Sequence, residues 1–300
     1  MAKISKAWQD QSFVKASVCV TVLNESEETI NKLLNALNSQ TLKPDEIIII
    51  DAKKYKNCSR SKGRNISIKK AKNEIIAVTD AGCLPHYNWL EKLTFPFTEK
   101  NNKVDVVAGG YEMITKNSFQ KACSVFLGVN KKDINSDFMP SARSLAFTKD
   151  IWKRAGGFPE KLTETAEDTV FNLELLKVGA KFVVAKNAMV DWSLPKDLSE
   201  FAISIYRYAK GDALSGIWWH PIKKFKTHNI KILTVFLRYL IFVLTFYYFG
   251  NLYFLSLLTL YAFWAFRKAG TWGVLLQFVS DIAGIIGFSH GILQSSTKRN

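Results

Sequence analysis

An abrupt change in polarity divides this 300-residue chain into two parts. Before Ile232 charged residues are dense, but from Ile232 onward only six side chains carry a formal charge: Arg238, Arg267, Lys268, Asp281, Lys298 and Arg299. A stretch this apolar must be buried in protein or lie in a lipid bilayer. We therefore expect a polar catalytic or binding domain over residues 16–216, an N-terminal extension over 1–15, an interfacial basic linker over 217–231 and a membrane region over 232–295.

Two apolar runs open the hydrophobic region. Residues 232–249 and 252–266 are each close to the roughly 20 residues of a spanning helix. Only Gly250 and Asn251 separate them, which predicts a tight hairpin. Lysines precede the first run and Arg267 and Lys268 follow the second, so the positive-inside rule places both ends on the cytoplasmic side. Trp218, Trp219 and His220 are typical of an interfacial anchor.

A third apolar run, residues 272–293, contains Gln277, Asp281 and His290. If it spanned the bilayer, the Lys298-Arg299 tail would lie outside, against the charge rule. We therefore prefer an interfacial or re-entrant helix and keep a spanning helix as the alternative. A helical bundle buried inside a soluble protein is the alternative for all three runs.

Strands and helices alternate along the first part of the chain. Ala16–Leu23 is predicted to be a strand, and Ser26 is predicted to be the N-cap of the helix that follows it. Residues 46–51 are then predicted to be a strand, 62–72 a helix and 75–79 a third strand. This βαβαβ order predicts an α/β fold with a doubly wound mixed sheet flanked by helices. Later strands are expected at 104–108, where Gly109 and Gly110 follow, and at 144–147, 182–184 and 189–190.

Polar residues follow each of the first three strands. Asn24 and Glu25 follow the first, Asp51 ends the second and Asp80 follows the third. The carboxyl ends of parallel strands form the ligand-binding edge of such sheets, so these side chains are expected to converge there. The alternative is that they only terminate strands.

The net charge of +15 admits nucleic acid, an anionic membrane or a phosphate-bearing substrate as partner. No nucleic-acid-binding motif accompanies the basic residues, so nucleic acid is not expected.

The polar N-terminus lacks the apolar run of a signal peptide, which predicts a catalytic domain on the cytoplasmic face of the cell membrane. The four cysteines form no C-x-x-C pattern and are expected to be reduced.

Residues 17–216 resemble the inverting family-2 glycosyltransferases of GT-A fold. The resemblance is carried by the opening segment Val20–Glu25 with Thr21, by Asp51, by Gly63-Arg64-Asn65, and by Glu74–Asp80, which leads into that family's D-x-D metal site. It continues in Gly156-Gly157-Phe158-Pro159 and Glu167-Asp168. It implies transfer of a hexose from a nucleotide sugar, most readily a UDP-sugar.

The metal motif departs from the family. Asp80 is followed by Ala81, Gly82 and Cys83, so the second aspartate is missing. Mg²⁺ or Mn²⁺, which prefer oxygen ligands, would then be held by Asp80 and the diphosphate. Gly82 stays a candidate contact of the nucleotide sugar in this motif.

The remaining roles also follow from the resemblance. Asp168, beside Glu167, would be the general base, although acidic residues favour a first helical turn without catalysis. Arg64 and Arg143 would face the phosphates, with surface ion pairing as the alternative. Arg207 would face the diphosphate or the acceptor. It lies where processive relatives carry Q-x-x-R-W, but Ser204 and Tyr208 depart from that motif, so processive synthesis is not inferred.

A membrane anchor next to a transferase indicates an acceptor at the membrane. The expected acceptor is a lipid-linked glycan, for example one on polyprenyl phosphate, in polysaccharide biosynthesis at the cell envelope. Two other functions stay open. One is a catalytically silent nucleotide-binding membrane scaffold, consistent with the missing carboxylate. The other is a nucleotidyltransferase, which normally carries an early Gly-rich phosphate loop that is absent at Asn24-Glu25-Ser26.

Overall fold

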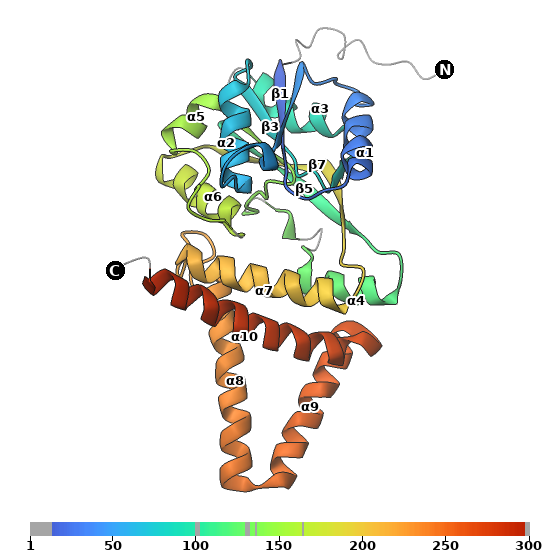
Figure 1. The fold of residues 1–300 in the computed structure, drawn as a ribbon, viewed down its shortest axis with the longest axis vertical. Helices are drawn as coiled ribbons and strands as arrows, with labels where there is room; N and C mark the ends of the chain where they lie inside the picture. Colours follow the sequence, from blue (N-terminus) through green and yellow to red (C-terminus); the bar gives the residue numbers. More distant parts are fainter. Residues whose placement is uncertain (1–13, 100–102, 130–132, 136, 164, 298–300) are drawn as a thin grey trace. The chain divides into compact units, whose positions relative to one another are not determined.

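The chain forms two compact units, seen in a computed structural model (Figure 1). The structure describes residues 14–99, 103–129, 133–135, 137–163 and 165–297. The expected extension 1–15 therefore lies almost wholly outside the described residues, as does the Lys298-Arg299 tail. The first unit comprises residues 1–112, 130–160 and 171–192, and the second 113–129, 161–170 and 193–300. The units are described separately.

A seven-stranded mixed sheet forms the centre of the first unit. Its order is β2-β1-β3-β6-β5-β7-β4. The central strands β1 and β3 run parallel to each other and β1 also pairs in parallel with β2, whereas β6 is antiparallel to both β3 and β5. The expected mixed α/β sheet is thereby confirmed. The strands are β1 (Ala16–Val22), β2 (Glu46–Asp51), β3 (Ile75–Val78), β4 (Cys83–Pro85), β5 (Val106–Ile114), β6 (Leu145–Thr148) and β7 (Phe182–Ser193).

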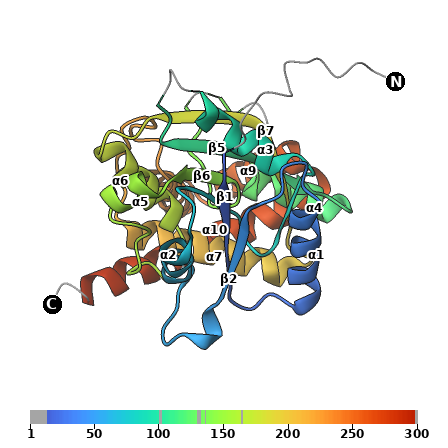
Figure 2. The same ribbon diagram turned by 90° about the horizontal axis from the view of Figure 1, so that it is seen from above.

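Helices flank this sheet, with α1 and α2 on opposite sides of the parallel strands (Figures 1 and 2). Ser26 caps α1 as expected, accepting from the Thr29 backbone N–H. Ser59 caps α2 by accepting from Lys62, so that helix begins two residues earlier than the sequence predicts. The helices are α1 (Glu27–Asn38), α2 (Arg60–Lys70), α3 (Trp89–Thr94), α5 (Lys149–Arg154) and α6 (Glu167–Lys177), with short 3₁₀ turns η2 (Ala52–Lys54) and η3 (Phe95–Thr98).

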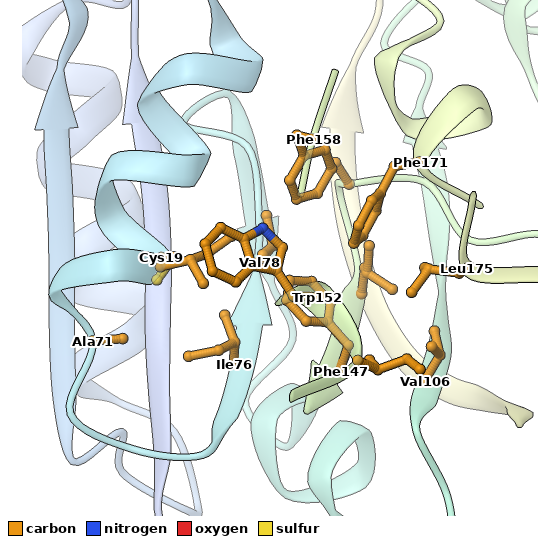
Figure 3. Close-up of a cluster of buried hydrophobic side chains, with 14 residues drawn as sticks. Cys19, Ala71, Ile76, Val78, Val106, Phe147, Trp152, Phe158, Phe171 and Leu175 are labelled. Atoms are coloured by element: carbon orange, nitrogen blue, oxygen red, sulfur yellow. The ribbon is translucent and has the colours of Figure 1, made fainter. Parts of the chain in front are cut away.

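The hydrophobic core of this unit contains a stack of aromatic rings (Figure 3). Phe158 and Phe171 are stacked with ring centroids 4.1 Å apart, and Phe147 meets Phe171 edge-on. Asn65 of α2 fixes the loop that carries Phe158: its Oδ1 accepts from the Phe158 backbone N–H at 2.9 Å, and its Nδ2 donates to the Phe158 carbonyl at 2.9 Å. The loop after α5 is therefore anchored to α2.

Two expectations for the strands were wrong. Gly109 and Gly110 were read as the end of a strand, but β5 continues through them to Ile114. A Cβ on Gly109 would lie 1.9 Å from Ser144 Oγ, so glycine here permits close packing rather than a turn. The short strands 182–184 and 189–190 are one continuous strand, β7. The exposed Lys186 and Asn187 interrupt only its apolar pattern.

The second unit contains a helical hairpin. Helices α8 (His228–Phe249) and α9 (Asn251–Ala269) meet at Gly250, whose φ is 81°. Thr227 caps α8, so the helix starts four residues before the predicted run. Two segments, 228–249 and 251–297, are long and apolar enough to cross a membrane by length and composition. The other elements are α4 (Ser118–Leu127), α7 (Leu198–Ser215), η5 (Gly270–Trp272) and α10 (Gly273–Thr297).

Helix α10 packs along α7, as Figures 1 and 2 both show. A Cβ on Gly287 would lie 2.3 Å from the Tyr206 carbonyl oxygen, and one on Gly291 would lie 2.6 Å from that of Lys210. The two backbones approach so closely only because these positions are glycine. The third apolar run therefore lies against α7 and crosses the open end of the hairpin in Figure 1. Helix α7 packs with α10 and belongs with the C-terminal helices to the second unit.

A buried carboxylate links the three C-terminal helices. Asp281 of α10 accepts from Arg238 Nη2 of α8 at 2.8 Å and from Gln277 Nε2 at 2.9 Å. It also accepts from the hydroxyl groups of Tyr239 and Tyr261. The Asp281 side chain is 3% exposed, and its four donors offset the cost of its burial.

Candidate active site

Asp80 lies at the edge of the sheet where the parallel strands β1, β2 and β3 end. The register places Val22 opposite Asp51 and Cys19 opposite Val78, and Asp80 follows two residues after Val78. The Asp80 carboxylate accepts from Arg64 Nη2 at 2.6 Å. The sequence predicted both residues for the site, and the structure pairs them directly.

Arg64 is a buried, fixed group. Its side chain is 2% exposed, and its guanidinium carbon lies 5.3 Å from the centroid of the Phe158 ring. The neighbouring Asn65 holds the backbone of Phe158. The Gly156–Pro159 segment, which the sequence analysis singled out, thus contacts Arg64 through the Phe158 ring.

Arg60 adds a second guanidinium that the sequence reasoning missed. It opens α2 four residues before Arg64, a spacing that places both on one helix face and could have revealed it. Glu25 Oε1 pairs with Arg60 at 3.2 Å. Its Oε2 accepts from the backbone N–H groups of Leu23 at 2.7 Å and Asn24 at 3.1 Å. Glu25 therefore both shapes the loop after β1 and holds Arg60.

Arg143 supplies a third guanidinium near the same carboxylate. Its guanidinium carbon lies 3.8 Å from the centroid of the Trp192 ring and 4.9 Å from that of Tyr111. Its Nη1 donates to Ser141 Oγ at 2.9 Å. These cation–π contacts hold the guanidinium in place. Trp192 and Tyr111 were not anticipated from the sequence.

These arginines determine the protonation of Asp80. Burial alone would raise the pKa of its carboxyl, but Arg64, followed by Arg60 and Arg143, outweighs burial and lowers the pKa to about 2. Asp80 is therefore ionised at every physiological pH. At Cys83, burial first and the Asp80 charge second raise the pKa of the thiol to about 12, although Arg143 and Arg60 act to lower it.

This pKa predicts how acid affects stability. A carboxyl whose pKa falls from 3.8 to about 2 on folding stabilises the fold above pH 4, and this contribution disappears as the pH falls toward 2. Its magnitude is about 2 kcal/mol. We expect Asp80→Asn to melt well below wild type at pH 6, and the difference to shrink between pH 4 and pH 3. Thermal unfolding followed by tryptophan fluorescence measures this; a difference that is independent of pH would contradict it.

The other predicted residues of this unit differ in their surroundings. Asp51 is half-buried, and its Oδ1 accepts from the Lys53 backbone N–H at 3.0 Å. Asn24 is exposed. Thr21 is buried on β1, where a Cβ on Gly63 would lie 2.3 Å from Thr21 Cγ2, so its side chain packs against α2. A contact of Thr21, Asn24 or Asp51 with a nucleotide stays a prediction.

The expected divalent cation fits the residues present here poorly. Asp80 is one carboxylate and is already paired with Arg64. No atom lies within 4 Å of the Cβ position of Gly82, where the D-x-D motif would supply a second carboxylate. Among the described residues there is no group of three or more His, Cys, Asp or Glu side chains that could hold a metal ion. Within the described part of this motif, a cation would thus meet the Asp80 carboxylate, which is already paired with Arg64.

Glu167, Asp168 and Arg207 belong to the second unit. Glu167 and Asp168 open α6 directly after Ala166, whose φ of 68° is uncommon for a residue with a side chain. Asp168 is half-buried, and its Oδ1 accepts from the Thr169 backbone N–H at 2.8 Å. Lys223 lies close enough that Asp168 acts on its pKa, although burial first and Lys231 second lower that pKa overall.

The segment before Asp168 is held by α7. Thr165 Oγ1 donates to the Arg207 carbonyl at 3.0 Å, and a Cβ on Gly211 would lie 2.1 Å from Thr165 Oγ1. The backbone of Arg207 therefore helps to position the loop that leads to Asp168, while the Arg207 side chain is exposed. Sequence reasoning had assigned Arg207 only a side-chain role.

No protein-family model matches the chain. Among curated proteins it is similar to the glycosyltransferase AglE of Haloferax volcanii, with 28% identity over 174 residues. The match covers 49% of this chain and 56% of AglE, so this chain spans little more than half of that relative's length.

The fold is similar to that of a solved mannosyltransferase. The mannosyltransferase PcManGT from Pyrobaculum calidifontis, in complex with GDP-Man and Mn²⁺, matches with a TM-score of 0.60 and 16% identity over 95% of this chain and 92% of that one. S. aureus TarS 1–349 in complex with UDP gives a TM-score of 0.47 at 16% identity over 96% of this chain and 92% of that one. The similarity to PcManGT concerns the fold.

Proposed function

We propose that this protein is a membrane-bound, inverting glycosyltransferase of the family-2, GT-A type. It transfers a hexose from a nucleotide-diphosphate sugar, most readily a UDP-sugar, to a lipid-linked or cell-surface glycan. The observation that carries this proposal is the group of three arginines around Asp80 at the carboxyl edge of parallel strands. The similarity of the fold to PcManGT, whose structure holds GDP-Man, and the partial match to AglE both support it.

The arginine group has the charge that a glycosyl donor requires. When the sugar leaves, negative charge develops on the diphosphate, and fixed positive groups stabilise that charge. Arg64 pairs directly with Asp80, and Arg60 and Arg143 lie near enough to lower the pKa of its carboxyl. Glu25 and Asp80 keep two of them in place.

The proposed chemical step is a single displacement. The acceptor hydroxyl oxygen attacks C1 of the sugar, the bond from C1 to the diphosphate oxygen breaks, and the nucleoside diphosphate leaves with that electron pair. Asp168 takes the hydroxyl proton, with Glu167 beside it. Attack opposite the leaving group inverts the configuration at C1. The resemblance of Glu167-Asp168 to the family's acidic pair supports the assignment of Asp168 as the base, and its carboxylate is half-buried.

The exposure of α8 supports a membrane location. Only 6% of its most apolar 18-residue window is buried, whereas a core helix of a soluble protein would be mostly buried. Large side chains near the hairpin tip are exposed, including Tyr247, Tyr248, Phe249 and Leu252. Exposure of these apolar surfaces to water costs free energy, and lipid would cover them. We propose that α8 and α9 span the membrane, that α10 lies at its cytoplasmic surface, and that the acceptor is membrane-linked, for example through polyprenyl phosphate.

The full-length protein in nanodiscs tests this function. We expect one or more of UDP-, GDP- and dTDP-sugars to raise its melting temperature, and the matching donor to yield a product of inverted anomeric configuration by NMR. Binding without transfer to any lipid-linked acceptor would favour the silent scaffold. Release of pyrophosphate from a nucleoside triphosphate and a sugar phosphate would favour the nucleotidyltransferase. No binding of any donor would contradict all three.

A further inference from the structure

We infer that Arg60, Arg64 and Arg143, rather than a divalent cation, supply most of the positive charge that holds the donor diphosphate. The inference rests on the proposed function, because it assigns the groups that bind the leaving group of that reaction. It differs from a site in which the metal ion is required before the nucleotide can bind.

The first argument is the state of Asp80. Its carboxylate is engaged by Arg64 at 2.6 Å, and Arg64 is 2% exposed and packed against Phe158. Freeing the carboxylate would break an ion pair of a buried guanidinium, which costs several kcal/mol. A cation would therefore have to share Asp80 with Arg64, and it would do so in the repulsive field of Arg60 and Arg143.

The second argument is the missing carboxylate. Position 82 has room for an aspartate side chain, because nothing lies within 4 Å of the Cβ position and Gly82 is not among the glycines with positive φ. The chain nevertheless carries glycine there. A divalent cation at this edge would depend on Asp80, water and the diphosphate for its ligands.

The third argument is the arrangement of the guanidiniums. Arg60 and Arg64 come from one face of α2, whereas Arg143 precedes β6, so the guanidiniums approach Asp80 from two elements. Cation–π contacts with Trp192 and Tyr111 hold the Arg143 guanidinium in place, and a guanidinium matches the geometry of phosphate oxygens.

Isothermal titration of UDP and of GDP into the full-length protein tests the inference. We expect the Kd of whichever nucleotide binds to differ by less than about threefold between buffers with Mn²⁺ and with EDTA. Arg143→Ala and Arg60→Ala should each raise the Kd in EDTA by about tenfold or more, the loss expected for a hydrogen bond to a charged group. Arg154→Ala is the matched control, because Arg154 is a partly exposed arginine of the same unit that pairs with Asp150 on α5.

Gly82→Asp provides a second, independent variant. The added carboxylate should weaken binding in EDTA by repelling the diphosphate, and it should make binding depend on Mn²⁺. Wild-type binding that disappears in EDTA would overturn the inference and leave the proposed function standing. Unchanged affinity in both arginine variants would also overturn it. No binding of either nucleotide in either buffer would count against the proposed function itself.

Discussion

Asp168→Asn is expected to lower kcat by about 10³-fold, within the range that a general base contributes. The amide keeps the size of the side chain, and its oxygen can still accept from the Thr169 backbone N–H, so the start of α6 should persist. An amide cannot take the proton of the acceptor hydroxyl. The affinity for the nucleotide should change by less than about threefold, because Asp168 does not belong to the arginine group.

Asp150→Asn is a matched control for this experiment. Asp150 also lies in the first turn of a helix, α5, and its side chain is 67% exposed. Its replacement should leave kcat unchanged. Glu167→Gln should be measured alongside, since a larger loss there than in Asp168→Asn would transfer the role of base to Glu167. Full turnover in both variants would remove the base from this pair of residues.

Asp281→Ala is expected to lower the free energy of unfolding by about 3–5 kcal/mol, because it breaks a buried ion pair from one side. The change leaves Arg238 without its carboxylate, and it removes the acceptor of Gln277 and of two tyrosine hydroxyl groups. Because these donors come from α8, α9 and α10, the loss should loosen α10 from the hairpin. Thermal unfolding of the protein in nanodiscs measures the effect.

Two further variants test whether the lost stability comes from the unpaired charge. Ser280→Ala, one residue away on α10 and only half-buried, should leave the melting temperature within about 2 °C of wild type. Replacing both partners, Arg238→Met with Asp281→Leu, should recover most of the stability, because an apolar pair of similar volume leaves no buried charge. If Asp281→Ala unfolded at the wild-type temperature, Asp281 would not hold these helices together.

The parallel strands and their helices could be predicted because their signals are local. β1 and β3 lie inside the sheet and are buried along their whole length, which produces their apolar runs, whereas β2 is an edge strand that is partly buried. The Ser26 cap is likewise a property of a few adjacent residues. Helix α4 was missed, although its cap is visible in the sequence: Asn117 Oδ1 accepts from the Gln120 backbone N–H, and Gln120 Oε1 accepts from the Lys116 backbone N–H.

Glycine shows where local signals become ambiguous. At Gly250 it marks a chain reversal, as predicted, with a positive φ. At Gly109 it permits β5 to approach Ser144 and Ala188, and at Gly287 it permits α10 to approach α7. One residue type serves both purposes, so only the neighbours in space distinguish them.

The sequence by itself determined the α/β alternation, the carboxylates at the strand ends, the missing partner of Asp80 and the apolar C-terminal segments, because each is written in adjacent residues. Tertiary structure alone decided the charge around Asp80 and the packing of α10. Arg143 is held near Asp80 by contact with Trp192 of β7, and the donors to Asp281 come from three helices. Such contacts depend on how distant segments pack, and no local pattern encodes that.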